Sequence, residues 1–199
     1  PTTPRDWAPP VPESWRLSNG IRVWHLEQGP TPLVSVLLVL LRGAATDPVG
    51  QAGLTELTAD MLDEGAAGRS ALEISEQLQE LATEYHVTAD VDHVTLSMDT
   101  LASTFVASIE LLADLVLQPE FPRDEFERRK EQRMAQALAN ESQAAWARAV
   151  VVRQVLFGDG YAGDLASGTR RTLERLELKH VKRHYGKLLA PDNVEFLGW

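Results

Sequence analysis

The sequence predicts an α+β fold, a two-layer sandwich in which a mainly antiparallel sheet has helices packed on one face. Segments with a period of two residues, which indicates strands, occur near both ends of the chain and in its middle. Segments with a helical period lie among them in an irregular order, without the regular alternation of a parallel sheet. The 199 residues are 44% hydrophobic and 24% charged, which is typical of a globular protein.

The first thirteen residues differ in composition from the rest of the chain. They contain five prolines, Pro1, Pro4, Pro9, Pro10 and Pro12. Proline lacks a backbone donor and favours extended chain over packed elements. We therefore expect a proline-rich arm over residues 1–13 and a single lobe over residues 14–199.

The lobe begins with elements of a sheet. Asn19-Gly20, between alternating residues on either side, predicts a β-hairpin over residues 15–24. The apolar run from Leu33 to Leu41 predicts a strand buried on both faces. After Gly43 and two turn signals, a helical period begins at Ala52.

The middle of the chain predicts a helix followed by a strand pair. Ser70 and Glu73 form a capping box at the start of the helix, in which each side chain satisfies a free backbone N–H. Alternating apolar residues over 85–91 and 94–98 predict two antiparallel strands that extend the first sheet.

The last third predicts mainly helices. A third helix spans about Phe105 to Val116, and a long helical tract runs to Phe157 with a break near Asn140. We expect a glycine-rich loop over residues 158–168. A helix from Leu173 to Leu189 and a short strand over residues 193–197 complete the prediction.

Composition excludes several classes of function. The net charge of -10 repels phosphate backbones and anionic lipid, so nucleic acid and a membrane surface are not expected partners. The longest apolar run, Leu33 to Leu41, is too short for a spanning helix, so membrane insertion is not expected. The absence of cysteine excludes disulfides, cysteine-bound zinc and thiol catalysis. A proline-rich arm without cysteine favours an exported, periplasmic bacterial protein, although a cytoplasmic protein can have the same features.

A series of landmarks runs along nearly the whole predicted lobe. They are Leu17-Ser18-Asn19-Gly20-Ile21-Arg22-Val23, Gly43, Gly53-Leu54, Leu111-Leu112-Ala113-Asp114-Leu115 with Pro119 and Phe121, Phe157-Gly158 with Tyr161 and Gly163, and Tyr185 with Pro191-Asp192-Asn193. In this order and spacing the chain resembles the N-terminal lobe of the pitrilysin/insulinase family of zinc peptidases. The resemblance implies a lobe of the processing-peptidase type and the N-terminal half of a two-lobed protein.

Active members of that family are metalloendopeptidases that bind zinc through His-x-x-Glu-His on the helix after the Gly-Leu step, with a later Glu as third ligand. Two side chains four residues apart share a helix face and reach one metal, and the Glu acts as general base. In this chain the first His position is Glu56, the general-base position is Ala59 and the second His position is Asp60. The later Glu falls at about Gln136. The resemblance thus implies a centre without catalytic or metal-binding residues, and no cofactor is expected, although zinc is the family's cofactor.

The acidic residues of this segment allow two interpretations. Glu56 and Asp60 are hard ligands that can bind calcium or magnesium weakly if further oxygen ligands are present. The interpretation that we favour is a solvated polar face formed by Glu56, Asp60, Asp63 and Glu64, opposite the apolar stripe of the helix.

Two histidines in the last predicted helix are also spaced four apart. His180 and His184 have no accompanying Glu, and Lys182, Arg183 and Lys187 repel a cation. We expect the positive side chains of this segment to favour the C-terminal end of the helix dipole instead.

These residues predict a noncatalytic lobe or subunit that supports peptide binding in a peptidase assembly. Its expected partners are a C-terminal lobe, an active homologous peptidase subunit, or both. Two alternatives stay open: an active metalloendopeptidase with displaced ligands, and a peptide-binding or assembly module without proteolysis.

Overall fold

A computed structural model describes residues 8–27, 29–158 and 165–199. Six strands form one sheet in the order β1-β2-β8-β3-β7-β6, in which only β2 and β8 run parallel. The strands of this sheet are β1 Glu13–Arg16, β2 Arg22–His25, β3 Leu33–Leu40, β6 Glu84–Ala89, β7 Val94–Leu101 and β8 Val194–Gly198. A separate short pair consists of β4 Gly65–Ala66 and β5 Arg69–Ser70.

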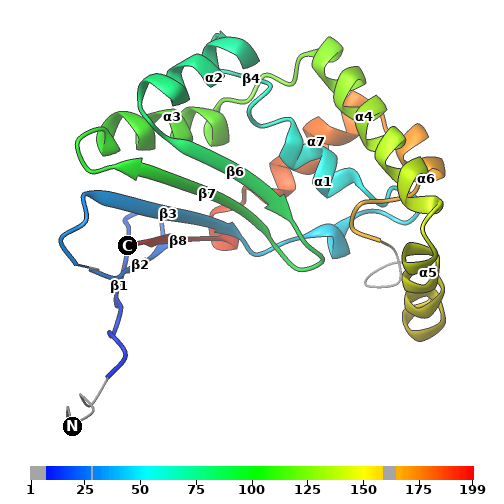
Figure 1. Ribbon diagram of the computed structural model, residues 1–199, viewed down its shortest axis with the longest axis horizontal. Helices are drawn as coiled ribbons and strands as arrows, with labels where there is room; N and C mark the ends of the chain where they lie inside the picture. The colour runs from blue at the N-terminus through cyan, green and yellow to red at the C-terminus, as the bar shows by residue number, and fades with distance from the viewer. Residues whose placement is uncertain (1–7, 28, 159–164) are drawn as a thin grey trace, which may run out of the picture.

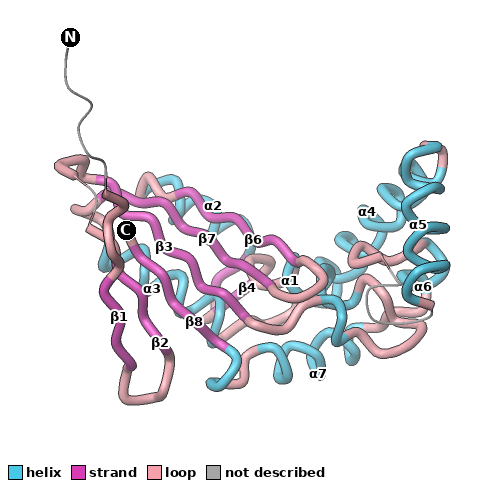
Figure 2. The backbone as a smooth tube through the Cα atoms, turned by 90° about the horizontal axis from the view of Figure 1, so that it is seen from below, coloured by secondary structure: helices cyan, strands magenta, loops and turns pink. Residues whose placement is uncertain are grey.

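Helices cover one face of this sheet and continue beyond one end of its strands (Figure 1). They are α1 Leu54–Asp60, α2 Ala71–Glu80, α3 Phe105–Leu117, α4 Arg123–Glu141, α5 Ala144–Phe157, α6 Arg170–Glu174 and α7 Leu178–Leu188, with 3-10 turns η1 Ala44–Thr46 and η3 Pro191–Asn193. Figure 2 shows the opposite face of the sheet, over which no helix of the described chain lies. The structure therefore has the two layers that the sequence predicts.

The core fills the space between the sheet and the helices. On β3, Val36 and Leu40 point toward the helices and are each 1% exposed. The alternate residues of β3 are half-buried, and Leu33 at its start is 51% exposed. The expectation that this run is buried on both faces is wrong, because no helix within the described residues covers the second face of the sheet.

Local signals place most other elements correctly. β6 and β7 pair antiparallel and join the first sheet through β3. The capping box of Ser70 and Glu73 opens α2. The long helical tract breaks at residues 142–143, between α4 and α5, two residues beyond the predicted break.

The helix expected from Leu173 to Leu189 is two helices, α6 and α7. The break is local, because Glu177 and His180 form a capping box that starts a new helix at Leu178. Part of the expected glycine-rich loop, residues 159–164, lies outside the described residues, as do residues 1–7 of the expected arm. Residues 8–12 have no regular secondary structure before β1 begins. Among the described helices, none is both long and apolar enough to cross a membrane.

Candidate functional site

The motif helix α1 begins at a sharply turned glycine. Gly53 has φ 95°, a left-handed conformation that glycine adopts at little cost. A Cβ atom at this position would lie 2.8 Å from a side-chain carbon of Leu173 and 3.0 Å from the carbonyl oxygen of Ser167. Both the conformation and the space therefore require glycine at the step that leads into the helix.

Asp47 satisfies the free backbone donors at the start of α1. One of its carboxylate oxygens accepts hydrogen bonds from the backbone N–H of Gly53 and Leu54, at 3.0 and 3.1 Å. The other accepts from the backbone N–H and the hydroxyl of Thr55, at 3.0 and 2.6 Å. A carboxylate at a helix N-terminus also interacts favourably with the helix dipole, so Asp47 fixes where α1 begins.

His184 of α7 completes this buried network. Its Nε2 atom lies 2.7 Å from the Thr55 hydroxyl and 3.5 Å from the Asp47 carboxylate. Because the Thr55 hydroxyl donates to Asp47, the Nε2–H of His184 donates to the Thr55 oxygen. Burial, together with the charges of Lys187 and Arg183, lowers the pKa of His184 to about 4. Burial raises the pKa of Asp47 to about 6, although its four hydrogen bonds act to lower that pKa. At neutral pH the pair is a carboxylate and a neutral imidazole.

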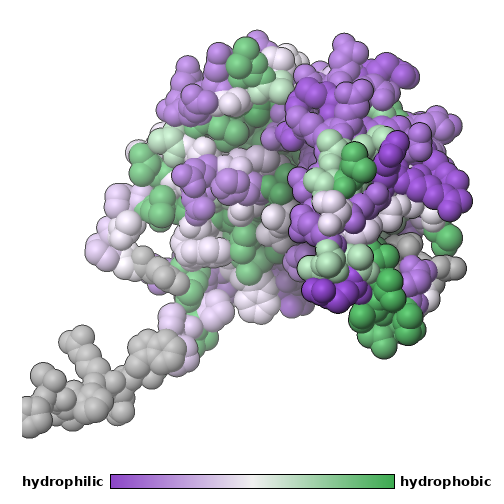
Figure 3. All heavy atoms as spheres, turned by 45° about the vertical axis from the view of Figure 1, so that its right-hand side comes forward, coloured by the Kyte–Doolittle hydropathy of each residue, from purple (hydrophilic) through white to green (hydrophobic). Residues whose placement is uncertain are grey.

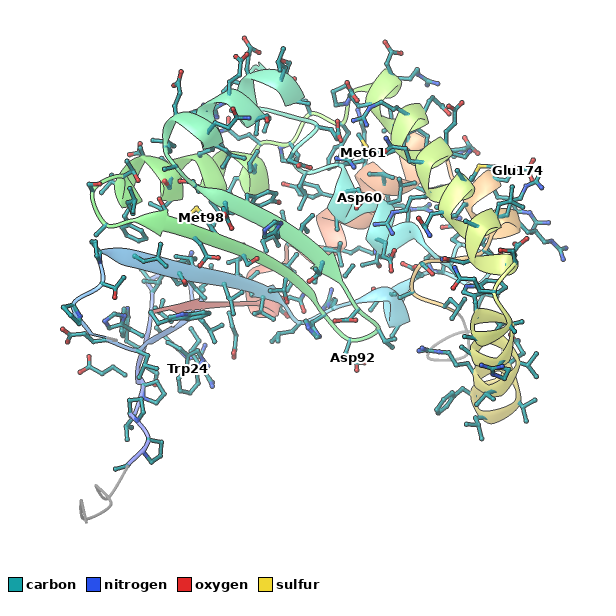
Figure 4. The ribbon with its side chains drawn as sticks, in the orientation of Figure 1. Trp24, Asp60, Met61, Asp92, Met98 and Glu174 are labelled. Carbon is teal, nitrogen blue, oxygen red and sulfur yellow. The ribbon has the colours of Figure 1, made fainter. Side chains whose placement is uncertain are left out.

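The two positions of the family's metal-binding histidines are joined by an arginine from α4. Arg133 donates from Nε and Nη2 to the two carboxylate oxygens of Asp60, at 2.5 and 2.7 Å, and from Nη1 to Glu56. Figure 4 shows Asp60 on α1, on the side of that helix that faces α4. Burial raises the pKa of Glu56, and the charge of Arg133 opposes that change. The guanidinium therefore links both carboxylates to the neighbouring helix.

A second ion-paired cluster lies in the turn that follows α1. Glu64 is only 2% exposed and accepts hydrogen bonds from Arg128 and Arg129. The side chains of Glu56 and Asp60 are 15% and 17% exposed. The expected solvated polar face is therefore wrong for Glu56, Asp60 and Glu64, which pair with three arginines of α4. Asp63 is half-buried.

Ala59 lies between the altered ligand positions and is 3% exposed. Together with Glu56, Asp60 and Arg133 it lines a cavity of about 220 Å³. The remaining wall consists of residues 87–89 of β6, an edge strand of the sheet. The position of the general base thus faces a small polar pocket beside a strand edge, but it carries no group that can accept a proton.

The structure does not bring the other sequence candidates into this pocket. Gln136 is exposed on α4 and donates to Asn140, one turn further along the same helix. His180 accepts from the backbone N–H of Glu177 and does not converge with His184. Sequence reasoning missed Arg133, although arginines spaced along one helix and carboxylates spaced along another are a signal for such pairing.

The chemistry of these residues does not fit a zinc centre. Both carboxylates that could act as ligands already accept hydrogen bonds from Arg133. The guanidinium stays protonated in proteins and presents donors where a metal needs electron pairs. In the described part of the chain, no three His, Asp or Glu side chains gather in a way that could hold a metal ion.

Comparisons with known proteins identify the family that shares this fold. Residues 22–172 match the insulinase family, peptidase family M16. The non-peptidase homolog YmxG of Helicobacter pylori (strain ATCC 700392 / 26695) is 24% identical over 168 residues, which are 84% of this chain and 39% of that protein.

Two solved structures have the same fold. The peptidase M16 inactive domain from Pseudomonas fluorescens superimposes with a TM-score of 0.90 at 23% identity, over 94% of this chain and 46% of that one. A protease from Helicobacter pylori superimposes with a TM-score of 0.87 at 16% identity, over 95% of this chain and 46% of that one. The chain spans less than half the length of each of these relatives.

The expected resemblance and the expected fold are both confirmed. The family match covers the motif helix, the edge strand β6 and the helix that provides Arg133. The chain therefore belongs to the insulinase family, peptidase family M16.

Proposed function

We propose that this chain is a noncatalytic lobe of a peptidase-family assembly and that it supports the binding of extended peptides. The observation that carries the proposal is the position of β6. This strand forms one edge of the sheet and borders the pocket at the altered motif. Within the described residues no strand pairs with its outer edge. An exposed edge offers unpaired backbone donors and acceptors to an extended peptide.

The absence of catalysis follows from the residue chemistry of the pocket. Ala59 cannot take a proton from water, and Arg133 holds the two neighbouring carboxylates. Two of the similar proteins are described as a non-peptidase homolog and as an inactive domain. These descriptions support the same role for this chain.

The partner that we propose is a second lobe or an active homologous subunit. Helix α5 offers a surface for it, because this helix has no buried residue. Five of its large apolar side chains are more than half exposed: Val151, Val152, Val155, Leu156 and Phe157. Figure 3 shows the resulting hydrophobic patch, in green at the lower right. Exposed apolar patches of this kind mark protein interfaces.

Hydrogen exchange on the purified chain tests the peptide-binding role. With unfolded, fluorescently labelled casein as probe, we expect slower amide exchange in β6 and an increase in fluorescence anisotropy. Strand β1, at the opposite edge of the sheet, is the internal control and should not change. Protection of both edges alike, or of neither, would exclude specific binding at β6.

Cleavage and co-purification separate the alternatives. We expect no cleavage of the labelled casein with or without added zinc. Cleavage that a chelator abolishes, at a rate proportional to the bound zinc, would instead identify an active metalloendopeptidase with displaced ligands. Co-purification with a homologue that has an intact His-x-x-Glu-His motif would support the peptidase assembly. Peptide binding without such a partner would favour a binding module that has no link to proteolysis.

A further inference from the structure

The arrangement around Arg133 has the geometry of a cation site that is already filled. Glu56 and Asp60 are one helical turn apart, so their side chains lie on the same face of α1. Arg133 reaches both from α4, with two donors to Asp60 and one to Glu56. Without this guanidinium, two negative charges would face each other at a largely buried position, which is unfavourable.

Arginine is well suited to hold this pair permanently. Its planar group carries donors in a fixed fork that matches a carboxylate in two-point contact. Burial works against the charge of Arg133, but hydrogen bonds to Asp60 and the charges of both carboxylates raise its pKa. The cation therefore belongs to the polypeptide and does not dissociate.

We propose that the Arg133 guanidinium is the built-in cation of the altered centre, holding Glu56 and Asp60 in place of a divalent metal ion and joining α1 to α4 without metal. The proposal rests on the noncatalytic role proposed above and specifies what occupies the altered site. Its consequence is that removal of the guanidinium exposes a pair of carboxylates beside a polar cavity of about 220 Å³. Hard divalent cations bind carboxylates together with water, so this variant should gain a weak calcium or manganese site.

The test compares Arg133→Ala with the wild-type protein in EDTA and in MnCl2. We expect the wild-type melting temperature to be the same in both. In EDTA, Arg133→Ala should have a lower melting temperature than the wild-type protein. We expect a Kd of about 10⁻⁴ to 10⁻³ M for manganese at the new site, and MnCl2 at about ten times this Kd should raise the melting temperature of the variant by about 3–5 °C. Isothermal titration should then detect one manganese ion per chain in the variant.

Three further variants make the result specific. Arg128→Ala removes a different ion-paired arginine of α4, one that contacts Glu64, and should gain no response to manganese. Arg133→Ala combined with Glu56→Gln and Asp60→Asn should lose the response, because the ligands are gone. Arg133→Gln provides a milder change if the alanine variant does not fold, and it should gain the response as well.

Two results would overturn the proposal. One is stoichiometric metal in the wild-type protein with a lower melting temperature in EDTA. The other is a folded Arg133→Ala or Arg133→Gln variant that does not respond to manganese. Failure of peptide binding would appear in the exchange of β6 amides and in the fluorescence anisotropy and would leave these metal measurements unaffected, so the two proposals can fail separately.

Discussion

Replacing His184 with Gln should change how the stability of this protein depends on pH. His184 is 3% exposed, and its Nε2 atom contacts the Thr55 hydroxyl at the start of α1. Glutamine is uncharged at all pH values and can still donate a hydrogen bond from a similar position. The substitution therefore removes a titrating group while it keeps most of the contact.

The expected size follows from the pKa of the imidazole. Burial lowers the pKa of His184 from 6.5 to about 4 in the folded protein. A group with a lowered folded-state pKa contributes stability that is complete above its unfolded pKa and is lost as the pH falls through the folded pKa. For His184 this window runs from pH 6.5 down to about 4, and the difference corresponds to about 3 kcal/mol.

Asp47 acts in the opposite direction in nearly the same window. Burial raises its pKa from 3.8 to about 6, so its contribution is complete below pH 3.8 and is lost as the pH rises through 6. When the pH falls from 7 to 4, Asp47 therefore adds about 2 kcal/mol to the free energy of unfolding, which offsets most of the stability that is lost through His184. These two groups together should leave the wild-type profile nearly flat, whereas His184→Gln should become more stable as the pH falls.

Urea unfolding followed by circular dichroism at several values between about pH 4 and pH 8 measures the difference. The free energy of unfolding of the wild-type protein, relative to that of His184→Gln, should be about 3 kcal/mol lower at pH 4 than at pH 8. His86→Gln, at an exposed position on β6, controls for the replacement of a histidine as such. A difference between wild type and His184→Gln that is the same at pH 7 and at pH 4 would refute the reasoning.

Three other substitutions have clear expected outcomes. Glu64→Gln should lower the free energy of unfolding, measured with urea, by about 2 kcal/mol, because two arginines lose a buried carboxylate. The control Glu76→Gln, on the exposed face of α2, should change it by less than about 0.5 kcal/mol. Gly43→Ala should lower the free energy of unfolding by about 1–3 kcal/mol, because the new Cβ would lie 2.4 Å from backbone atoms of the β6–β7 turn. The control Gly186→Ala, in α7 where a Cβ has open space, should raise it by about 0.5–1 kcal/mol. Val155→Glu should abolish co-purification with a partner without changing the melting temperature, since this side chain is 78% exposed.

Much of the fold can be predicted because its signals are local. The period of two residues places β6 and β7, and the pair Ser70 and Glu73 places the start of α2. The apolar run at Leu33 was misleading, because a continuous apolar strand is compatible with burial on both faces or with one open face. Which of these occurs depends on whether another layer covers the sheet, and no local pattern contains that information.

The site is harder to predict, because its contacts join residues far apart in sequence. Glu56 and Asp60 have the same local pattern whether they face water or an arginine, and Arg133 follows Asp60 by 73 positions. Asp47 looks like a turn residue until the fold places its carboxylate at the start of α1. The lack of a general base at Ala59 can be predicted from the sequence alone. The contact of Arg133 with Glu56 and Asp60 depends on tertiary structure.

Ion pairs join α4 to α1 and to the turn that follows α1, and they explain how this centre keeps its shape without the family's metal ligands. Three carboxylates at positions 56, 60 and 64 are each matched by at least one arginine of α4, and the most buried of them, Glu64, is matched by two. A buried carboxylate without a partner is strongly destabilising, so acidic residues at these positions require cations on the facing helix. The arginines therefore preserve the contact between two helices that form the wall of the pocket, while Ala59, at the position of the general base, has no group that can accept a proton. The position of β6 relative to α1 then depends on packing and ion pairs that belong to the chain, and peptide binding at this edge should not require metal.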